Sequence, residues 1–406
     1  NATARRLAPL LAGLAMIGPF SIDTFFPAFR VMGEHFQVSP AAMQQTISVY
    51  LAVYSFMSLF HGPLSDAYGR RRVILFFAAL FAVASLGCAL APSFAALLWC
   101  RALQGVAAGA GLIIGRAIIR DRFAGADAQR LMSNVTLIFG IAPAIAPVIG
   151  GWLLTWTGDW RPLFGFLAVF SVLMVAWCAW MLPETLPAAM RTPFKPATLA
   201  RTYRAMLRDA PFGWLSAAAA CNFGALFIYI ASAPALILDV LRLGERDFAW
   251  LFVPAIGGMM LGATISGRLA GKRSPEQMMQ ICFRLVALAV ALNLGINLSM
   301  PAQLPWVMLP VCVLGIGIAV GFPTLALVVL DRFPATRGAG SSLQTASSLL
   351  LMSLLSGLVS PWVSHHPLGL ACTSAALSGL AYFSWRQAQR RLGLPAVTPQ
   401  HTPDEA

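Results

Sequence analysis

The sequence predicts an all-α polytopic membrane protein with twelve transmembrane helices in two pseudo-symmetric six-helix bundles. Three observations support this fold class: apolar runs recur along the whole chain, basic residues segregate to one side, and the two halves share short motifs. The 406 residues are 58% hydrophobic and 11% charged, whereas about 25% of the residues of a soluble domain are charged. The composition therefore excludes a soluble globular protein.

A helix needs about 20 apolar residues to cross the hydrocarbon core of a bilayer. The first apolar run, 7–29, is too long for the core of a signal peptide and lacks a small-residue cleavage site, so we expect it to remain as a span. The expected spans are 7–29, 42–61, 73–91, 94–117, 131–157, 162–182, 211–238, 248–270, 277–299, 304–330, 339–363 and 368–386.

The distribution of Lys and Arg sets the topology. With the N-terminus in the cytoplasm, nearly all basic residues fall at cytoplasmic helix ends or loops. Arg30, Arg161, Arg242 and Arg246 lie outside, and Arg101 lies within a span. This asymmetry follows the positive-inside rule and places both termini in the cytoplasm. The net charge of +13 is therefore a consequence of topology, and we expect no nucleic-acid partner.

A basic, proline-containing connection divides the chain into two halves. We expect an N-terminal bundle at 1–182, a cytoplasmic linker at 183–210, a C-terminal bundle at 211–386 and a cytoplasmic tail at 387–406. Within the linker, "ATLARTYRAMLRD" has the composition of a short helix on the membrane surface.

The two halves also repeat short motifs at similar offsets. "GPLSDAYGRRR" (62–72) has the counterpart "GRLAGKR" (267–273), and "RDRF" (120–123) has the counterpart "LDRF" (330–333). Repeats of this kind are typical of transporters whose halves move about a central site. A chance match of short basic motifs is the alternative.

Other functional classes find little support in the sequence. The seven cysteines form no CxxC pair, so neither disulfides nor a metal site is expected. No His/Glu/Cys cluster has metal-ligand spacing, and no nucleotide-binding glycine loop is present. We therefore expect neither an enzyme nor a bound cofactor, and the energy for transport must come from an ion gradient.

Several motifs resemble those of a known family. "GPLSDAYGRRRV" (62–73) and "LLWCRALQGVAAG" (97–109) are similar to the loop and span-four motifs of the major facilitator superfamily. "APVIGG" (146–151) resembles its span-five antiporter motif, with Ala146 where glycine is usual. "IDTFFPAF" (22–29) and "LFIYIASAPALIL" (226–238) are similar to the bicyclomycin-resistance (Bcr/CflA) branch.

This resemblance implies a monomeric, proton-driven exporter of chloramphenicol-type or bicyclomycin-type drugs in a bacterial inner membrane. A proton-coupled uptake symporter for a small metabolite on the same fold is the alternative. The loop motif has Ala67 where a basic residue is usual, and Gly13, Leu14 and Ala15 stand where some relatives carry a second acid. The proton stoichiometry, the drug and the oligomeric state are left open by the sequence.

Asp23 is the only acidic residue inside any expected span. A charge at the centre of a bilayer costs about 2.5–3.5 kcal/mol on the insertion scale. At a rise of about 1.5 Å per residue, Asp23 and Arg101 reach similar depths in the same bundle, so we expect them to pair. Asp23 is then the candidate proton carrier, in a helix loosened by Pro19 and Pro27. A static buried ion pair is the alternative.

Polar and aromatic residues near mid-membrane are candidates for the substrate wall. Asn222 and Tyr229 share one face of span seven, and an amide in lipid needs a partner. For each aromatic residue, ordinary packing is the alternative. The candidate substrate-binding residues are Tyr50, Tyr54, Gln104, Asn222, Tyr229, Phe25, Phe26, Met57 and Phe223.

The loop after span two is a candidate cytoplasmic gate. Gly69 permits a tight turn, after which Arg70 and Arg71 can bind carboxylates or helix C-terminal carbonyls. The resemblance implies that Arg70 pairs with Asp121 and that Asp66 meets the N-terminal end of span eleven, as a latch that stabilises the outward-open state. A plain basic loop that serves topology is the alternative.

The proline and glycine residues of span five are the candidate antiporter motif. Pro143, Pro147, Gly150 and Gly151 are expected to kink the helix and to allow close packing against span eight. A seal against proton leak is one role for such packing. Ordinary tolerance of Gly and Pro in transmembrane helices is the alternative.

Overall fold

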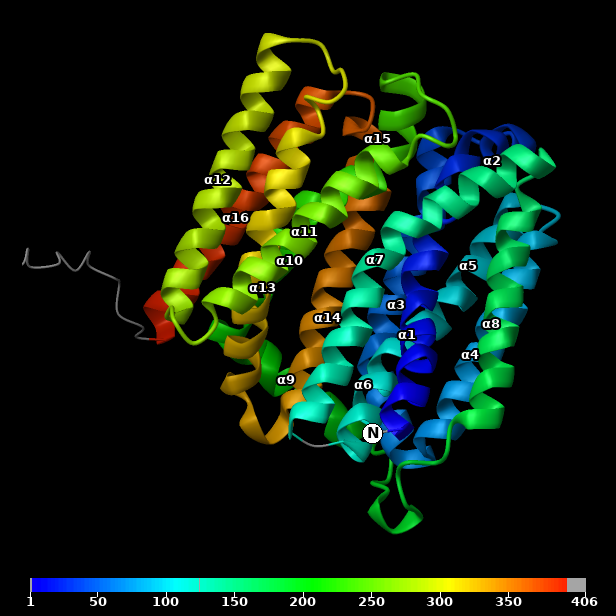
Figure 1. Cartoon of the computed structure of the whole chain (residues 1–406), viewed down its shortest axis with the longest axis vertical. Coiled ribbons are helices and arrows are strands. Elements are labelled where there is room, and N and C mark those ends of the chain that lie inside the picture. Colours follow the sequence, from blue (N-terminus) through cyan, green and yellow to red (C-terminus); the bar gives the residue numbers. More distant parts are fainter. Residues whose placement is uncertain (1, 124, 393–406) are drawn as a thin grey trace, which may run out of the picture.

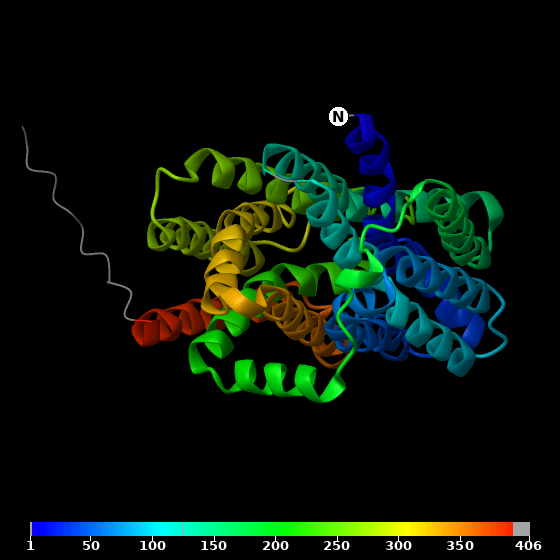
Figure 2. The ribbon, with the colours of Figure 1, turned by 90° about the horizontal axis from the view of Figure 1, so that it is seen from below.

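The computed structural model describes residues 2–123 and 125–392. In these ranges, twelve helical segments are long and apolar enough to cross a membrane, as the sequence predicts. The helices run along the long axis of the molecule (Figure 1) and form two bundles that lie side by side when seen from below (Figure 2). The predicted fold class is confirmed.

The N-terminal bundle contains two broken spans. The first breaks after Asp23, because the ring of Pro27 would clash with the carbonyl group of Asp23 in a continuous helix. The fourth breaks at Gly109. The elements are α1 (Ala2–Asp23), η1 (Phe26–Ala28), α2 (Phe29–Phe36), α3 (Pro40–Tyr68), α4 (Arg70–Ala89), α5 (Phe94–Ala108), α6 (Ala110–Arg122), α7 (Gly125–Thr157) and α8 (Arg161–Met181).

The linker and the C-terminal bundle follow the same plan. α9 is the helix expected in the linker, and it lies across rather than along the spans (Figure 2). The elements are η2 (Ala188–Met190), α9 (Pro196–Arg208), α10 (Ala210–Ala231), η3 (Ala235–Val240), α11 (Ala249–Leu269), α12 (Pro275–Ser299), α13 (Leu309–Arg332), η4 (Pro334–Thr336), α14 (Arg337–Leu354), η5 (Leu355–Val359), α15 (Ser360–Val363) and α16 (Pro367–Leu392).

Several expected boundaries differ from the structure, and two of these differences affect the first span and the tail. The first span continues through α2 to Phe36, so Asp23 lies near the middle of the span. At the other end, α16 continues to Leu392, so the beginning of the expected tail is helical, while 393–406 lies outside the described residues.

Corresponding helices pack closely in both bundles through glycine. A Cβ on Gly105 of α5 would lie 2.5 Å from the backbone oxygen of Tyr50 in α3. A Cβ on Gly315 of α13 would lie 2.7 Å from the backbone oxygen of Ala255 in α11. Small residues permit such close approach between membrane helices. A glycine therefore allows close packing of span four on span two, and another allows close packing of span ten on span eight. This correspondence between the two halves supports the internal repeat.

Candidate functional site

Arg101 is the centre of a buried polar network in the N-terminal bundle. Its guanidinium group donates to the backbone oxygen of Thr46 at 3.0 Å, to the backbone oxygen and hydroxyl of Ser21 at 3.0 and 2.9 Å, and to Gln104 at 2.6 Å. The Arg101 side chain is fully buried. These bonds join α1, α3 and α5, so a single side chain ties three helices together.

Two aromatic rings enclose the same guanidinium group. Its carbon atom lies 4.4 Å from the ring centre of Tyr50 and 4.7 Å from that of Phe25. Such contacts stabilise a desolvated cation by about 2 kcal/mol or more. Together with the hydrogen bonds from Nε and Nη1, they hold Arg101 without a carboxylate, and its buried Nη2 atom is left without a hydrogen-bond partner.

The predicted ion pair between Asp23 and Arg101 is wrong for this conformation. Both residues lie in the described part of the chain, and no nitrogen of Arg101 comes within the 4.0 Å that defines an ion pair with Asp23. Asp23 is 3% exposed, and its Oδ1 atom has no hydrogen-bond partner. The physical reason is competition, because Ser21, Thr46 and Gln104 hold the Nε and Nη1 atoms of Arg101, while its Nη2 atom has no hydrogen-bond partner.

The aromatic and amide candidates of the N-terminal bundle are buried inside it. Tyr50 donates its hydroxyl to the backbone oxygen of Gly18 at 3.2 Å, and Tyr54 is 7% exposed. Gln104 donates to Ser85 of α4 at 2.7 Å. These three residues therefore build the surroundings of Arg101, and none of these bonds directs a side chain toward the other bundle.

The phenylalanines after Asp23 belong to an aromatic cluster. Phe25 packs on Phe164 with ring centres 5.4 Å apart, and Phe26 packs on Phe252 of α11 at 6.1 Å. Both are fully buried. Ordinary packing, the alternative to a substrate contact, is what this conformation shows. Met57 and Phe223 are partly buried.

The two candidates of span seven face α12 in this structure. Tyr229 accepts a hydrogen bond of 2.6 Å from Asn293, and Asn222 donates to the sulfur of Cys282 at 3.8 Å. Both partners lie on α12, a peripheral helix that packs on α13 and α16. Their shared face is confirmed, but it points into the C-terminal bundle and not toward the N-terminal bundle. Asn293 was missed, although an amide in an apolar run was a usable signal.

The two bundles are joined across the outer half of the molecule. Among the described residues, hydrogen bonds between bundles extend from the outer surface inward to Ser55, which donates to the backbone oxygen of Ala346 at 2.7 Å. Closer to the outer surface, Gln44 donates to the backbone oxygen of Ala231 at 3.0 Å. The structure is therefore closed on its outer side.

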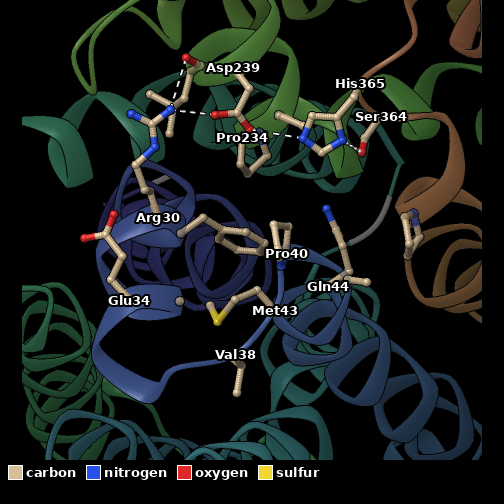
Figure 3. Close-up of a pocket in the computed structure, with 16 residues that line it drawn as sticks. Arg30, Glu34, Val38, Pro40, Met43, Gln44, Pro234, Asp239, Ser364 and His365 are labelled. Atoms are coloured by element: carbon tan, nitrogen blue, oxygen red, sulfur yellow. Dashed lines mark hydrogen bonds and ion pairs between the residues drawn. The ribbon is translucent and has the colours of Figure 1, made fainter.

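An ion pair covers this closure at the outer surface. Arg30 binds Asp239 at 2.5 Å, and His365 contacts the other carboxylate oxygen of Asp239 at 3.2 Å. Figure 3 shows these side chains reaching toward one another over a cavity of about 220 Å³, with Gln44 on its far wall. We call Arg30, Asp239 and His365 the outer seal. Arg30 was expected on the outer side from the sequence, whereas its partner Asp239 was missed.

The cytoplasmic motif forms the contacts expected of it within the N-terminal bundle. Arg70 donates to Asp121 at 3.0 Å and is also ion-paired with Asp66. Arg71 donates to the backbone oxygen of Ala179 at 2.6 Å, in the last turn of α8. Gly69 has φ of 97°, which is strained for any residue with a side chain. These local predictions are confirmed.

The expected bond to span eleven is not found. Among the described residues, Asp66 is bound to Arg70, and no hydrogen bond joins it to α14, whose first residue, Arg337, pairs with Asp331. The Arg70–Asp121 bond is also intact while the outer side is closed. The reason is geometric, since every partner of Arg70 lies in the N-terminal bundle or at the start of the linker.

A second cytoplasmic ion pair was missed in the C-terminal half. Arg332, at the end of α13, donates to both carboxylate oxygens of Asp209, at 3.2 and 2.8 Å. Asp209 also caps α10 by accepting from the backbone nitrogen of Phe212 at 2.9 Å. The hydrogen bonds from Arg332 lower the pKa of Asp209. The "LDRF" motif therefore has an ion-pair partner, as "RDRF" has in the other half.

The glycines of span five pack against two different neighbours. The space that a Cβ would need at Gly150 is occupied by the backbone oxygen of Thr24, next to Asp23. At Gly151 it is occupied by the backbone oxygen of Glu245, just before α11. Pro143 and Pro147 lie inside the continuous helix α7. Packing near span eight is confirmed for Gly151, whereas Gly150 packs on the break in span one.

These features define a class of protein. Two six-helix bundles, buried polar groups within them and contacts that close the bundles together on the outer side fit the architecture of an alternating-access membrane carrier. The chain belongs to the Major Facilitator Superfamily, whose sequence profile matches residues 11–357. It is a transporter and not an enzyme.

Individual relatives cover nearly the whole chain. It is 31% identical to the uncharacterized MFS-type transporter YdgK of Bacillus subtilis, over 93% of this chain and 94% of that protein. It is 26% identical to a bicyclomycin resistance protein homolog of Haemophilus influenzae (91% and 93% covered). It is 28% identical to a chloramphenicol resistance protein of Pseudomonas aeruginosa (85% and 83% covered).

Solved structures share the fold at low sequence identity. A bacterial homolog of the lysosomal transporter Spinster has a TM-score of 0.72 and 16% identity, covering 98% of this chain and 99% of that one. The xylose transporter XylE from E. coli has a TM-score of 0.69 and 12% identity, covering 95% and 98%. These likenesses support the fold.

Proposed function

We propose that the protein is a proton-coupled antiporter that exports small amphipathic drugs across a bacterial inner membrane, with Asp23 as the proton carrier. One observation carries this proposal: Asp23 is a buried carboxylate in mid-span whose Oδ1 atom is unpartnered, while Arg101 is bound through Nε and Nη1 to Thr46, Ser21 and Gln104. The motifs and the relatives named for chloramphenicol, bicyclomycin and multidrug resistance support the drug substrate.

Proton binding at Asp23 is linked to conformation by its position. It ends α1 at the break in span one, and the residue after it contacts Gly150 of α7. A movement of the bundles that reorients this break changes the neighbours and the water access of Asp23. Since an unpaired charge at this depth costs about 2.5–3.5 kcal/mol, each change of surroundings favours one protonation state over the other. Arg101, held two residues away at Ser21, is the nearby cation that a rearrangement can bring to Asp23.

The proton gradient is a sufficient energy source. One proton moving inward at about 100 mV releases about 2.3 kcal/mol. Since about 1.4 kcal/mol corresponds to a tenfold ratio, this supports a drug gradient of roughly 50-fold before any pH difference is added.

The test is drug-dependent proton movement in energised inside-out vesicles, followed with a pH-sensitive dye. Chloramphenicol and bicyclomycin are added to vesicles containing the parent chain, Asp23→Asn or Glu34→Gln. Glu34 is the matched control, because it is an exposed acid at the outer end of the same span. We expect a drug-induced proton efflux with the parent chain and with Glu34→Gln, and none with Asp23→Asn.

Other outcomes separate the parts of the proposal. Full coupling in Asp23→Asn would overturn the role of Asp23. A proton signal with a metabolite and with neither drug would favour the alternative, an uptake symporter. Growth protection by the expressed chain against either drug would distinguish export from uptake in cells.

A further inference from the structure

A groove lies on the flank of the C-terminal bundle, between α12 and α16. These two helices are in contact on one side of the molecule (Figure 1). The groove has a volume of about 660 Å³. It is separate from the outer seal and from the Asp23–Arg101 region, since both helices belong to the periphery of one bundle.

The walls of the groove are apolar along the helices and basic near their cytoplasmic ends. Phe283 of α12 packs on Tyr382 of α16 with ring centres 5.3 Å apart. Arg284 and Arg386 line the groove, one from each helix. Both are exposed, and neither forms an ion pair or hydrogen bond with a residue whose side chain the structure describes. Two positively charged side chains therefore line one groove, and no acidic side chain that the structure describes pairs with either of them.

A buried polar atom on the same wall also lacks a partner. Ser378 lines the groove, its side chain is 6% exposed, and its hydroxyl forms no hydrogen bond in the described part of the chain. A buried hydroxyl group without a partner is unfavourable. The groove thus offers a hydrogen-bond donor as well as two charges to an occupant.

The depth of the arginines matches the inner lipid headgroups. Arg284 lies nine residues into α12 and Arg386 six residues before the end of α16, which is about 9–14 Å from the cytoplasmic helix ends. Basic pockets between membrane helices on the cytoplasmic side attract anionic lipid headgroups. We propose that this groove binds an anionic phospholipid of the cytoplasmic leaflet, with the phosphate held by Arg284 and Arg386 and an acyl chain along the apolar wall.

The test uses the purified full chain in detergent, with dioleoylphosphatidylglycerol as the anionic probe and dioleoylphosphatidylcholine as the neutral one. Native mass spectrometry counts the retained lipids, and the melting temperature reports stabilisation by a bound ligand. We expect phosphatidylglycerol to bind and stabilise more than phosphatidylcholine. The Arg284→Ala/Arg386→Ala variant is expected to bind it roughly 30-fold more weakly, because each basic residue contributes about fivefold.

Two variants control for charge and folding. Arg273→Ala/Arg390→Ala removes the same charge from exposed positions outside the groove and is expected to bind like the parent chain. Arg284→Lys/Arg386→Lys is expected to keep most of the binding. Equal loss in both alanine variants, equal binding of the two lipids, or the same stabilisation by inorganic phosphate alone would overturn the proposal.

Discussion

The guanidinium group of Arg101 is bound to Ser21, two residues before Asp23, through both the backbone oxygen at 3.0 Å and the hydroxyl at 2.9 Å. This cation is thus anchored to the same helix turn as Asp23 without forming an ion pair with it. The same bonds keep the helix that carries Asp23 attached to α5.

Arg101 is expected to stabilise the folded chain as well as to supply a positive charge near Asp23. Arg101→Ala removes bonds that join three helices and leaves buried acceptors without partners. Each buried acceptor left without a partner costs about 1–3 kcal/mol, so the loss of several such bonds should destabilise the chain by about 3–5 kcal/mol. At about 2–4 °C per kcal/mol, we expect the melting temperature in detergent to fall by about 6–20 °C. Arg72→Ala, at an exposed position beside the cytoplasmic motif, should change it little, and a parent-like melting temperature for Arg101→Ala would contradict the network.

The outer seal is expected to bias the carrier toward the outward-closed state. Arg30→Ala or Asp239→Asn removes a part-exposed ion pair that contributes up to about 1 kcal/mol, so the outward-open population should rise by up to about fivefold. The reporter is Ala235→Cys, which lines the cavity below the seal and is 7% exposed in the parent. Its labelling by a membrane-impermeant maleimide should accelerate accordingly.

The control for the seal is Arg161→Ala in the same reporter background. Arg161 pairs with Asp159 at 3.4 Å on the outer surface, but both residues belong to the N-terminal bundle. Its removal should leave the labelling rate unchanged. Equal acceleration in Arg30→Ala and Arg161→Ala would show that general surface charge, and not the bridge between bundles, controls access.

Gly150 is expected to tolerate no side chain. Gly150→Ala places a Cβ on the backbone oxygen of Thr24, which cannot move without shifting the break beside Asp23. Gly140→Ala is the matched control in the same helix, because no atom lies within 4 Å of its Cβ position. We expect transport to fall at least tenfold in Gly150→Ala and to remain in Gly140→Ala, whose melting temperature should not decrease because alanine is the better helix former. Vesicle transport assays compare the two, and equal activity would rule out tight packing at Gly150.

The Asp209–Arg332 pair predicts a pH-dependent stability difference. Arg332 lowers the pKa of Asp209 in the folded state, so the stabilisation is fully present above the ordinary aspartate pKa of about 3.9. It is lost as the pH falls through the lowered pKa. Asp209→Asn keeps the helix cap and removes the charge, so it should be less stable than the parent at pH 7 by up to about 1 kcal/mol. The difference in melting temperature between the parent and Asp209→Asn should be constant from pH 7 to about pH 5 and should narrow as the pH falls below the ordinary aspartate pKa of about 3.9.

The capping of α10 by Asp209 supplies an internal control for the comparison of the parent with Asp209→Asn. Asp209→Ala loses the cap as well as the ion pair, which adds about 1 kcal/mol of destabilisation. This additional difference should persist at every pH. Identical pH profiles for the parent and Asp209→Asn would show that the ion pair contributes nothing to the stability of the folded chain.

Much of the fold and part of the site were predictable from the sequence. The spans, the linker helix and the local contacts of Arg70 and Arg71 follow from hydrophobic length, charge placement and turn chemistry, which act over a few residues. The partner of Arg101 was not predictable in this way. Depth along a helix places two residues at one level, but the rotation of each helix and the competition among acceptors decide whether their side chains meet.

The sequence by itself determined the twelve-span fold and the family, and it predicted which face is cytoplasmic and that the helix is loosened around Asp23. Each depends on local properties: apolar length, basic residues at loop ends, and a proline four residues after the acid. Only the tertiary structure decided that Arg101 binds Ser21, that Tyr229 faces α12, and that Arg30 reaches Asp239 in the other bundle. These are contacts between segments that are distant in sequence, and they depend on how each helix is rotated and on how the two bundles pack against each other.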